Sequence, residues 1–445
     1  MALGRRRAQR QDGLWIATGE VAAGPGHPFY TRVNEILAEA GFDRWVEQRC
    51  ERFYARIGRP GIPPGVYFRM LMIGYFEGLD SERGIAWRCA DSLGLRAFLG
   101  YGLTKATPDH STLSVIRHRI DIETHEEIFG WILERLDERG LIKGKRIGVD
   151  ATTLEANAAL RSLVRNDTGE GYQEFLEALA KASGIDTPTR EDLARMDRKR
   201  KGKGSNDDWH NPHDPDAKIT KMKDGRTHLA HKAEHAVDME TGATLSVTVQ
   251  PASRGDTSSI GETLSDAMAN LDELGLEAEE LVADKGYHSK ARVAALADAG
   301  LRTYVAEPKR GRQRWRGQEK ERDAVYANRR RIRGDRGKSQ LRRRGEMLER
   351  PFAHCYETGA MRRTHLRGHE NIRKRLLIHV GACNLGLLMR SICGAGTPKG
   401  LRARGAALRA LTEALLAPRT WHLRLPAGAT VLNPTSPRLI APIAA

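Results

Sequence analysis

Residues 228–249 read HLAHKAEHAVDMETGATLSVTV, and this stretch decides the fold class. We predict strands at 228–238 and 243–249, because the short link Met239–Gly242 between them ends in glycine, as a hairpin turn does. Upstream, Arg146–Asp150 is a short apolar strand.

Downstream of this hairpin, helices and strands alternate. The pattern predicts a helix at 256–274, a strand at 280–283, a helix at 289–299 and a strand at 301–305. This order indicates an α/β fold with a mixed sheet flanked by helices, whose last strands require right-handed crossovers.

The region before the first strand is predicted to be helical. Apolar residues recur at helical spacing in 64–89, and Asp80 and Ser81 can cap a second helix, 82–90. The break Pro108–Ser111 can cap a third helix, 112–120. Short helices joined by tight breaks are typical of a helix-turn-helix-like DNA-binding domain, and a plain helical bundle fits the pattern equally well.

These patterns divide the chain into three parts. We expect a helical N-terminal DNA-binding domain at 1–140 and a catalytic α/β domain at 141–390. Insertions are predicted at 154–226 and 308–344, and the Ala-, Gly- and Pro-rich stretch 391–445 is predicted to be a weakly ordered tail.

The charge of the chain points to nucleic acid as the partner. The net charge is +16, and segment 308–344 holds sixteen Lys or Arg against four Asp or Glu. A polyanion such as DNA fits this excess. We find no run of about 18 apolar residues and expect no membrane span. The five cysteines show no paired spacing, which favours a reducing cytoplasm over a zinc site or disulfides.

Two aspartates stand at the ends of predicted strands. Asp150 ends the strand at 146–150, and Asp284 follows the strand at 280–283 and precedes a glycine turn. Ligands bind at the carboxyl ends of strands in open α/β sheets, so the two side chains should converge. Such carboxylates repel each other unless cations neutralise them, and hard oxygen ligands suit Mg²⁺ or Mn²⁺. A third acid should come from the following helix, where spacing alone leaves Glu346 and Glu349 open.

At these residues the chain resembles a known family. The strings GVDATTLEANAA (148–159), VADKGYHS (282–289), RRRGEMLERPFAH (342–354) and HLRGHENIRKRLLIHVGACNLGLLMR (365–390) look like those of insertion-sequence DDE transposases. That group has an RNase H-like core, an insertion before the last catalytic helix and an InsH-type helical N-terminal domain, to which the segment ending in PDHSTLS (108–114) is similar. The resemblance runs from about residue 60 to residue 390.

The resemblance implies a catalytic, metal-binding triad of Asp150, Asp284 and Glu349, since the family's helix reads acid, two residues, Phe, as Glu349 to Phe352 does. Many relatives also place Arg four residues before the third acid and Lys seven after it. Here those positions are Gly345 and Tyr356, and Arg343 or Arg344 could replace the arginine.

The mechanism implied is phosphodiester hydrolysis at the element ends, followed by attack of the freed 3′-hydroxyl on target DNA, with two Mg²⁺ ions that Mn²⁺ can replace. We expect a cytoplasmic, nucleoid-associated enzyme that forms a homodimer on DNA. The competing functions are a nuclease or resolvase without strand transfer and an inactive DNA-binding copy. Trp315 is either a base-stacking residue or a hydrophobic anchor. The expected DNA-binding residues are Arg117, Arg119, Arg312, Arg314, Trp315, Arg316, Arg329, Arg330, Arg331, Arg343 and Arg344.

Overall fold

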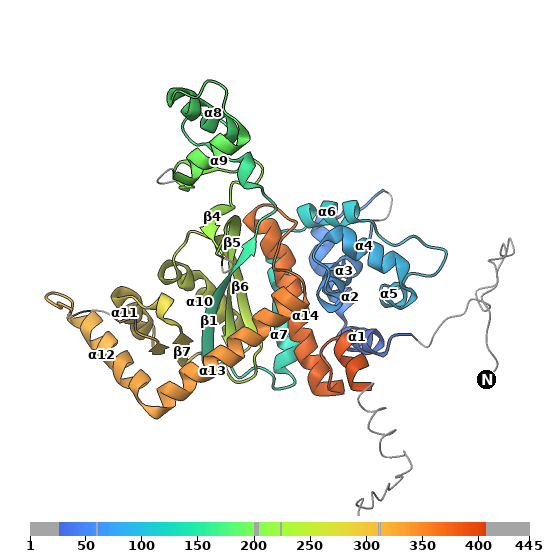
Figure 1. Cartoon of the computed structure of the whole chain (residues 1–445). Coiled ribbons are helices and arrows are strands. Elements are labelled where there is room, and N and C mark those ends of the chain that lie inside the picture. The colour runs from blue at the N-terminus through green and yellow to red at the C-terminus, as the bar shows by residue number, and fades with distance from the viewer. Residues whose placement is uncertain are drawn as a thin grey trace, which may run out of the picture. The chain divides into compact units, whose positions relative to one another are not determined.

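A mixed sheet forms the centre of the protein in a computed structural model that describes residues 26–58, 61–199, 204–222, 225–309, 311 and 313–405. Its strand order is β4-β5-β1-β7-β8, and β6 also pairs with β5 (Figure 1). The strands are β1 (Arg146–Glu155), β4 (Lys218–Lys221), β5 (Thr227–Asp238), β6 (Thr244–Pro251), β7 (Glu280–Ala283) and β8 (Arg302–Val305). β7 runs parallel to β1 and β8, and β5 runs antiparallel to its neighbours. The expected α/β fold with a mixed sheet is confirmed.

Helices cover both faces of this sheet. α10 (Asp256–Glu273) packs on one face, where its Ser259 and Thr263 hydroxyls donate to the buried Glu234 of β5. α13 (Asp335–Phe352) crosses the other face, where Leu348 packs with Val237 and Val282. α11 (Lys290–Asp298) and α12 (Glu319–Arg333) pack beside β8.

Seven α-helices precede the sheet in the described part of the chain, and two of them begin where the sequence predicted capped breaks. They are α1 (Pro28–Glu39), α2 (Phe42–Cys50), α3 (Pro64–Glu77), α4 (Glu82–Asp91), α5 (Leu93–Phe98), α6 (His110–Arg119) and α7 (Ile122–Asp137). The predicted caps of α4 and α6 are confirmed, because Ser81 Oγ accepts from the Gly84 N–H and Asp109 Oδ1 from the Ser111 N–H.

The long helix α14 (His369–Cys393) connects these helices to the sheet. It packs against α3, α7 and β6. Its fully buried Arg375 donates to the Leu71 carbonyl of α3 at 2.8 Å, and Asn384 pairs with the Thr244 backbone of β6. The described residues up to Leu401 accordingly form one compact unit with a shared hydrophobic core.

The expectation that the chain has no membrane span can be compared with the helices of the structure. Among the described residues, the helical stretch His369–Gly405 is long and apolar enough to cross a membrane, and 67% of its most apolar window is buried inside the protein. Burial of this kind is typical of the core helix of a globular protein. Ala395, inside the predicted tail, is also buried, while residues 406–445 of that tail lie outside the described residues.

The first predicted insertion is shorter than expected. β1 continues to Glu155, and β4 returns to the sheet edge at Lys218, so the insertion covers 156–217. It contains α8 (Tyr172–Ala182), α9 (Arg190–Lys199) and the short pair β2 (Val164–Arg165) and β3 (Trp209–His210). Small apolar clusters around Trp209 and Leu193 stabilise this lobe.

The second predicted insertion, 308–344, is not separate from the catalytic helix. Its described residues include α12 and the first ten residues of α13, which begins at Asp335 and not at Gly345. α13 contains Pro351 and continues directly into a π-helical turn, Ala353–Thr358. Proline removes a backbone donor, so a change of helix geometry directly after Pro351 is physically expected.

Candidate active site

Asp150 and Asp284 lie next to each other on parallel strands. β1 and β7 are in register with Val149 opposite Ala283, and each aspartate is the next residue along its strand. Both side chains follow a residue of the α10 face and therefore point to the face that α13 crosses. The convergence that the sequence predicted is present in the structure.

The Asp150 carboxylate is half-buried and has two partners. It accepts hydrogen bonds from the Ala151 N–H at 2.8 Å and from Arg344 Nη1 at 2.9 Å. Burial raises the pKa of Asp150, and the neighbouring Asp284 carboxylate raises it further, while the Arg344 guanidinium opposes the rise. Like charges at this strand end therefore repel each other, as a cation-binding pair does before its cation arrives.

Asp284 is fixed by the turn that follows it. Its Oδ1 accepts from the Gly286 N–H at 2.7 Å and caps the short 3₁₀ turn Lys285–Tyr287. A Cβ at Gly286 would lie 2.4 Å from Asp256 Oδ2 and 3.0 Å from Asp284 Oδ1. A side chain at this position would have to displace the Asp256 carboxylate and crowd that of Asp284, and glycine avoids both contacts.

The two candidates for the third acid both lie on α13. Phe352 of this helix packs on His235, which pairs directly with Asp150 in the sheet. Glu346 and Glu349 are both exposed, and Glu346 forms an ion pair with Arg350 at 2.6 Å. The choice of Glu349 therefore rests on the family resemblance.

The donor set suits a divalent cation, although the three acids do not form a closed cluster. Within the described ranges, no group of three His, Cys, Asp or Glu side chains is close enough to hold a metal ion. Two adjacent carboxylates are hard oxygen ligands of the kind that Mg²⁺ prefers, and a guanidinium now provides the positive charge beside one of them. The residues fit the ion once Arg344 moves away.

Comparison with known protein families shows to which family the chain with this site belongs. A family model described as Transposase DDE domain matches residues 195–385, and one described as Transposase domain (DUF772) matches residues 22–119. The chain belongs to the DDE transposases of insertion sequences. No curated protein and no solved structure matches the transposase.

Only two of the three candidate acids of the transposase lie within the residues that the DDE family model matches. Asp284 and Glu349 lie inside the DDE match, while Asp150 precedes it, because the 156–217 insertion separates β1 from β5 along the chain. The structure nevertheless joins β1 and β5 over nine residue pairs, Ile147 to Glu155. The transposase is an enzyme that acts on DNA, and its family generally uses divalent metals.

Four of the expected DNA-binding arginines contact the protein itself. Arg117 is buried and forms an ion pair with Glu82, so its assignment to DNA was wrong. Arg329 pairs with Glu307, Arg331 donates to the Thr303 carbonyl and hydroxyl, and Arg344 pairs with Asp150. Helical spacing explains these internal contacts, since a helix on a sheet points part of its side chains inward.

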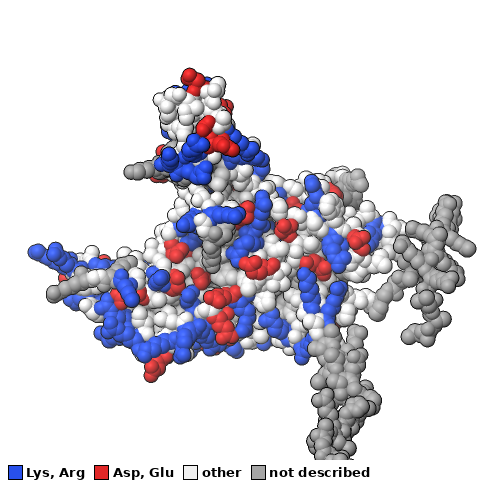
Figure 2. All heavy atoms as spheres, viewed as in Figure 1, with Lys and Arg blue, Asp and Glu red and all other residues white. Residues whose placement is uncertain are grey.

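The remaining expected DNA contacts lie toward solvent or outside the described residues. Arg119, Arg314, Arg316, Arg330 and Arg343 are exposed. Figure 2 shows Lys and Arg side chains gathered along the α12–α13 edge of the transposase. Trp315 packs near Tyr326 and under Lys290 Nζ, 4.3 Å from its ring centroid, which favours the anchor interpretation. Arg312 lies outside the described residues.

Sequence reasoning missed a buried polar network beneath the sheet. Lys232 Nζ donates to Asp256 Oδ1 at 2.6 Å and to Ser259 Oγ at 2.8 Å, and Glu234 accepts from Tyr287 at 3.0 Å. The signal was present in the sequence, because Lys232 and Glu234 alternate with alanines in a strand. We expected the insertion to pack over the polar side chains of this strand. The insertion does contact His231, whose Nε2 lies 3.1 Å from Asp214 Oδ2, whereas α10 packs over Glu234.

Proposed function

We propose that this transposase hydrolyses phosphodiesters at the ends of its element and joins the freed 3′-hydroxyl to target DNA. Asp150, Asp284 and Glu349 are the proposed catalytic residues, and they would hold two Mg²⁺ ions, which Mn²⁺ can replace. The observation that supports this proposal most directly is that Asp150, inside β1, and Asp284, directly after β7, each follow one residue of the register pair Val149–Ala283 on adjacent parallel strands. When bound, the metal activates water and stabilises the oxygens of an in-line phosphoryl displacement.

Arg344 has a defined part in this proposal. Without DNA it neutralises Asp150 at 2.9 Å and offsets the repulsion from Asp284. When a phosphodiester enters, its charge offers the guanidinium a second anionic partner. Arg344 would then contact the phosphate and take the place of the family's arginine, whose position is occupied here by Gly345.

The rest of the chain has supporting functions in the proposal. The exposed α12–α13 arginines contact the DNA backbone, and residues 1–140 contribute to recognition of the element ends. The catalytic part covers 141–390, and two copies assemble on DNA in the nucleoid. Capped, closely spaced helices and the basic α12–α13 surface support these assignments.

The test is a joining reaction. The full chain is incubated with Mg²⁺, a duplex containing the DNA that adjoins its gene, and a supercoiled target plasmid. We expect cleavage at a defined end and a joined product, both abolished by EDTA. Cleavage without joining would support a nuclease or resolvase instead. DNA binding without cleavage under Mg²⁺ or Mn²⁺ would overturn the proposal and favour an inactive copy.

A further inference from the structure

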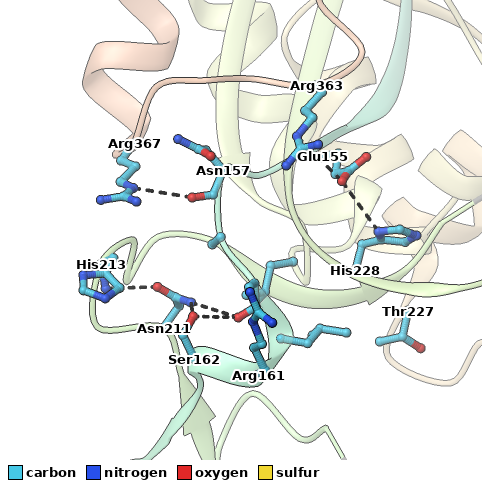
Figure 3. Close-up of a pocket in the computed structure, with 14 residues that line it drawn as sticks. Glu155, Asn157, Arg161, Ser162, Asn211, His213, Thr227, His228, Arg363 and Arg367 are labelled. Atoms are coloured by element: carbon cyan, nitrogen blue, oxygen red, sulfur yellow. Dashed lines mark hydrogen bonds and ion pairs between the residues drawn. The ribbon is translucent and has the colours of Figure 1, made fainter.

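A solvent-filled cleft of about 650 Å³ lies at the end of β1, away from the candidate acids. Four segments that are distant in sequence surround it: the end of β1 with the start of the insertion at 155–162, the insertion's return at 211–213, the start of β5 at 227–229, and the loop at 363–367 (Figure 3). Its size falls within the range of ordinary ligand sites. Neither the expected triad nor the α12–α13 surface contributes to it.

The cleft carries positive charge. Arg161, Arg363 and Arg367 line it from different segments, and all three are exposed. The one acid in its lining is Glu155, whose Oε1 lies 3.8 Å from Arg363 Nε and 3.9 Å from His228 Nδ1. The excess of guanidinium groups over carboxylates suits an anionic ligand.

The lining also indicates which kind of anion fits. Among the described residues that line it there is no Phe, Tyr or Trp, and its only rings are the imidazoles of His213 and His228. Its uncharged polar side chains include those of Asn157, Ser162, Asn211 and Thr227. Guanidinium groups and amides bind phosphate oxygens, which every DNA sequence presents alike.

Hydrogen bonds fix the walls of the cleft to one another. The Glu155 N–H donates to the Arg362 carbonyl at 3.0 Å, and the Thr364 N–H donates to the Glu155 carbonyl at 2.9 Å. On the opposite wall, the fully buried Asn211 donates to Ser162 Oγ at 3.0 Å. The cationic side chains therefore extend from a backbone that is already assembled before any ligand binds.

The cleft lies at the end of the strand that carries Asp150. Glu155 is five residues beyond Asp150 on the same strand, a separation of about 17 Å at about 3.3 Å per residue. Between them, Arg362 donates to Thr152 Oγ1 at 2.8 Å. One DNA strand advances about 3.4 Å per phosphate. The same distance therefore corresponds to about five nucleotides.

We propose that this cleft binds backbone phosphates of a DNA strand about five nucleotides from the phosphodiester that is cut, through Arg161, Arg363 and Arg367. The inference rests on the proposed function for the location of the cut beside Asp150. The contact itself is independent of sequence and of metal. It gives the 156–217 insertion a function, because one wall of the site belongs to the insertion.

Salt dependence of DNA binding tests the contact without any cleavage. The probe is a 40-base-pair duplex of arbitrary sequence, bound by the full chain. Each phosphate contact contributes about 0.9 to the slope of log affinity against log salt. The combined variant R161Q/R363Q/R367Q should flatten this slope by about 2–3, and Glu155→Gln should raise the affinity.

The matched control removes three exposed arginines elsewhere, R44Q/R139Q/R302Q, which leaves the same net charge. Its slope should change by less than 1. Circular dichroism and an unchanged unfolding midpoint show that each variant is folded. Equal slopes for the cleft variant and the wild-type chain, or equal losses in the two triple variants, would overturn the proposal.

Phosphate-ethylation interference on the DNA flanking the gene tests the location. Interference about five nucleotides from the mapped cut should be present with the wild-type chain and absent with the cleft variant. The same interference pattern for the wild type and the cleft variant would show that the cleft does not contact this phosphate. If Asp150→Ala still cleaves, the proposed function fails instead, while the salt-slope result remains a separate measurement.

Discussion

Arg344 of α13 donates a 2.9 Å hydrogen bond to Asp150 of β1, across 194 residues of sequence. The neighbouring Arg343 instead reaches the Glu240 carbonyl at 3.3 Å. The sequence left open whether Arg343 or Arg344 replaces the family's arginine. The contact with Asp150 favours Arg344. The candidate active site therefore holds its own counter-charge in the absence of DNA.

Arg344→Gln should separate metal binding from cleavage. Without the guanidinium, Asp150 and Asp284 face each other with less positive charge nearby, so Mn²⁺ should bind the DNA-free protein more tightly. Cleavage should slow by roughly tenfold or more, because a charge-assisted hydrogen bond is worth about 1.5–3 kcal/mol. Calorimetry and single-turnover cleavage measure the two effects. Arg343→Gln is the control, and equal behaviour of both variants would count against the role of Arg344.

Glu349→Ala should abolish Mg²⁺-dependent cleavage, as should Asp150→Ala and Asp284→Ala. DNA binding should change little, because carboxylates bind the metal and do not attract phosphate. Glu346→Ala is the matched control, since it lies one helical turn away and pairs with Arg350 in solvent. Normal cleavage by Glu349→Ala together with loss in Glu346→Ala would reverse the assignment of the third acid.

Several elements of the sheet and its cover were predicted within one or two residues, whereas β1 was predicted to end at Asp150 and continues for five more residues to Glu155. β7 and β8 and the helix α10 are examples, because hydrophobic periodicity and glycine turns mark their ends. Strand β4 was missed, since four residues inside a polar insertion carry too short a pattern. Its place is determined by pairing with β5, which is a tertiary effect.

The candidate site was predictable in its acids and not in its arginines. Asp150 and Asp284 are recognisable because aspartate is rare at the ends of apolar strands. Whether an arginine faces DNA or protein depends on partners distant in sequence, such as Glu82 for Arg117 and Glu307 for Arg329. The net charge of the sequence counts paired and exposed arginines alike, so it overestimates how many arginines are available to bind DNA.

The basic α12–α13 surface gives a third prediction. Neutralising the exposed Arg330, Arg333 and Arg342 together should flatten the salt dependence of DNA binding, by about 0.9 in slope for each phosphate that the protein no longer neutralises. The measurement is affinity for random duplex DNA between 50 and 200 mM salt, roughly the range where such effects are large. An unchanged slope would mean that this surface does not touch DNA.

The Glu307–Arg329 pair gives a prediction about stability and pH. The paired guanidinium of Arg329 lowers the pKa of Glu307 below its usual value of 4.5. The pair therefore stabilises the fold above about pH 4.5, and this contribution is lost as the pH falls through the lowered pKa. Arg329→Gln should cost about 1–2 kcal/mol at pH 7. Denaturant unfolding should show the difference from wild type shrinking below pH 4; a constant difference would contradict the ion-pair explanation.

End recognition by α6 should be tested in the full chain. An isolated fragment 1–140 would lack α14, whose Arg375 is buried against Leu71. The exposed face of α6 includes Ser111, Val115 and His118. Changing these three to alanine should reduce the preference for element-end DNA over random DNA and leave non-specific affinity nearly unchanged. Equal preference in variant and wild type would move recognition to another surface.

Because α14 packs against both the N-terminal helices and the sheet, it also fixes the distance between the N-terminal helices and Asp150. Bases read by the N-terminal helices and a phosphate beside Asp150 would be held at a constant spacing, without a hinge between them. If one base pair were inserted or deleted between the recognised bases and the cut phosphate, no domain rotation would compensate for the changed spacing. The site of cutting should then move with the recognised sequence, base pair for base pair.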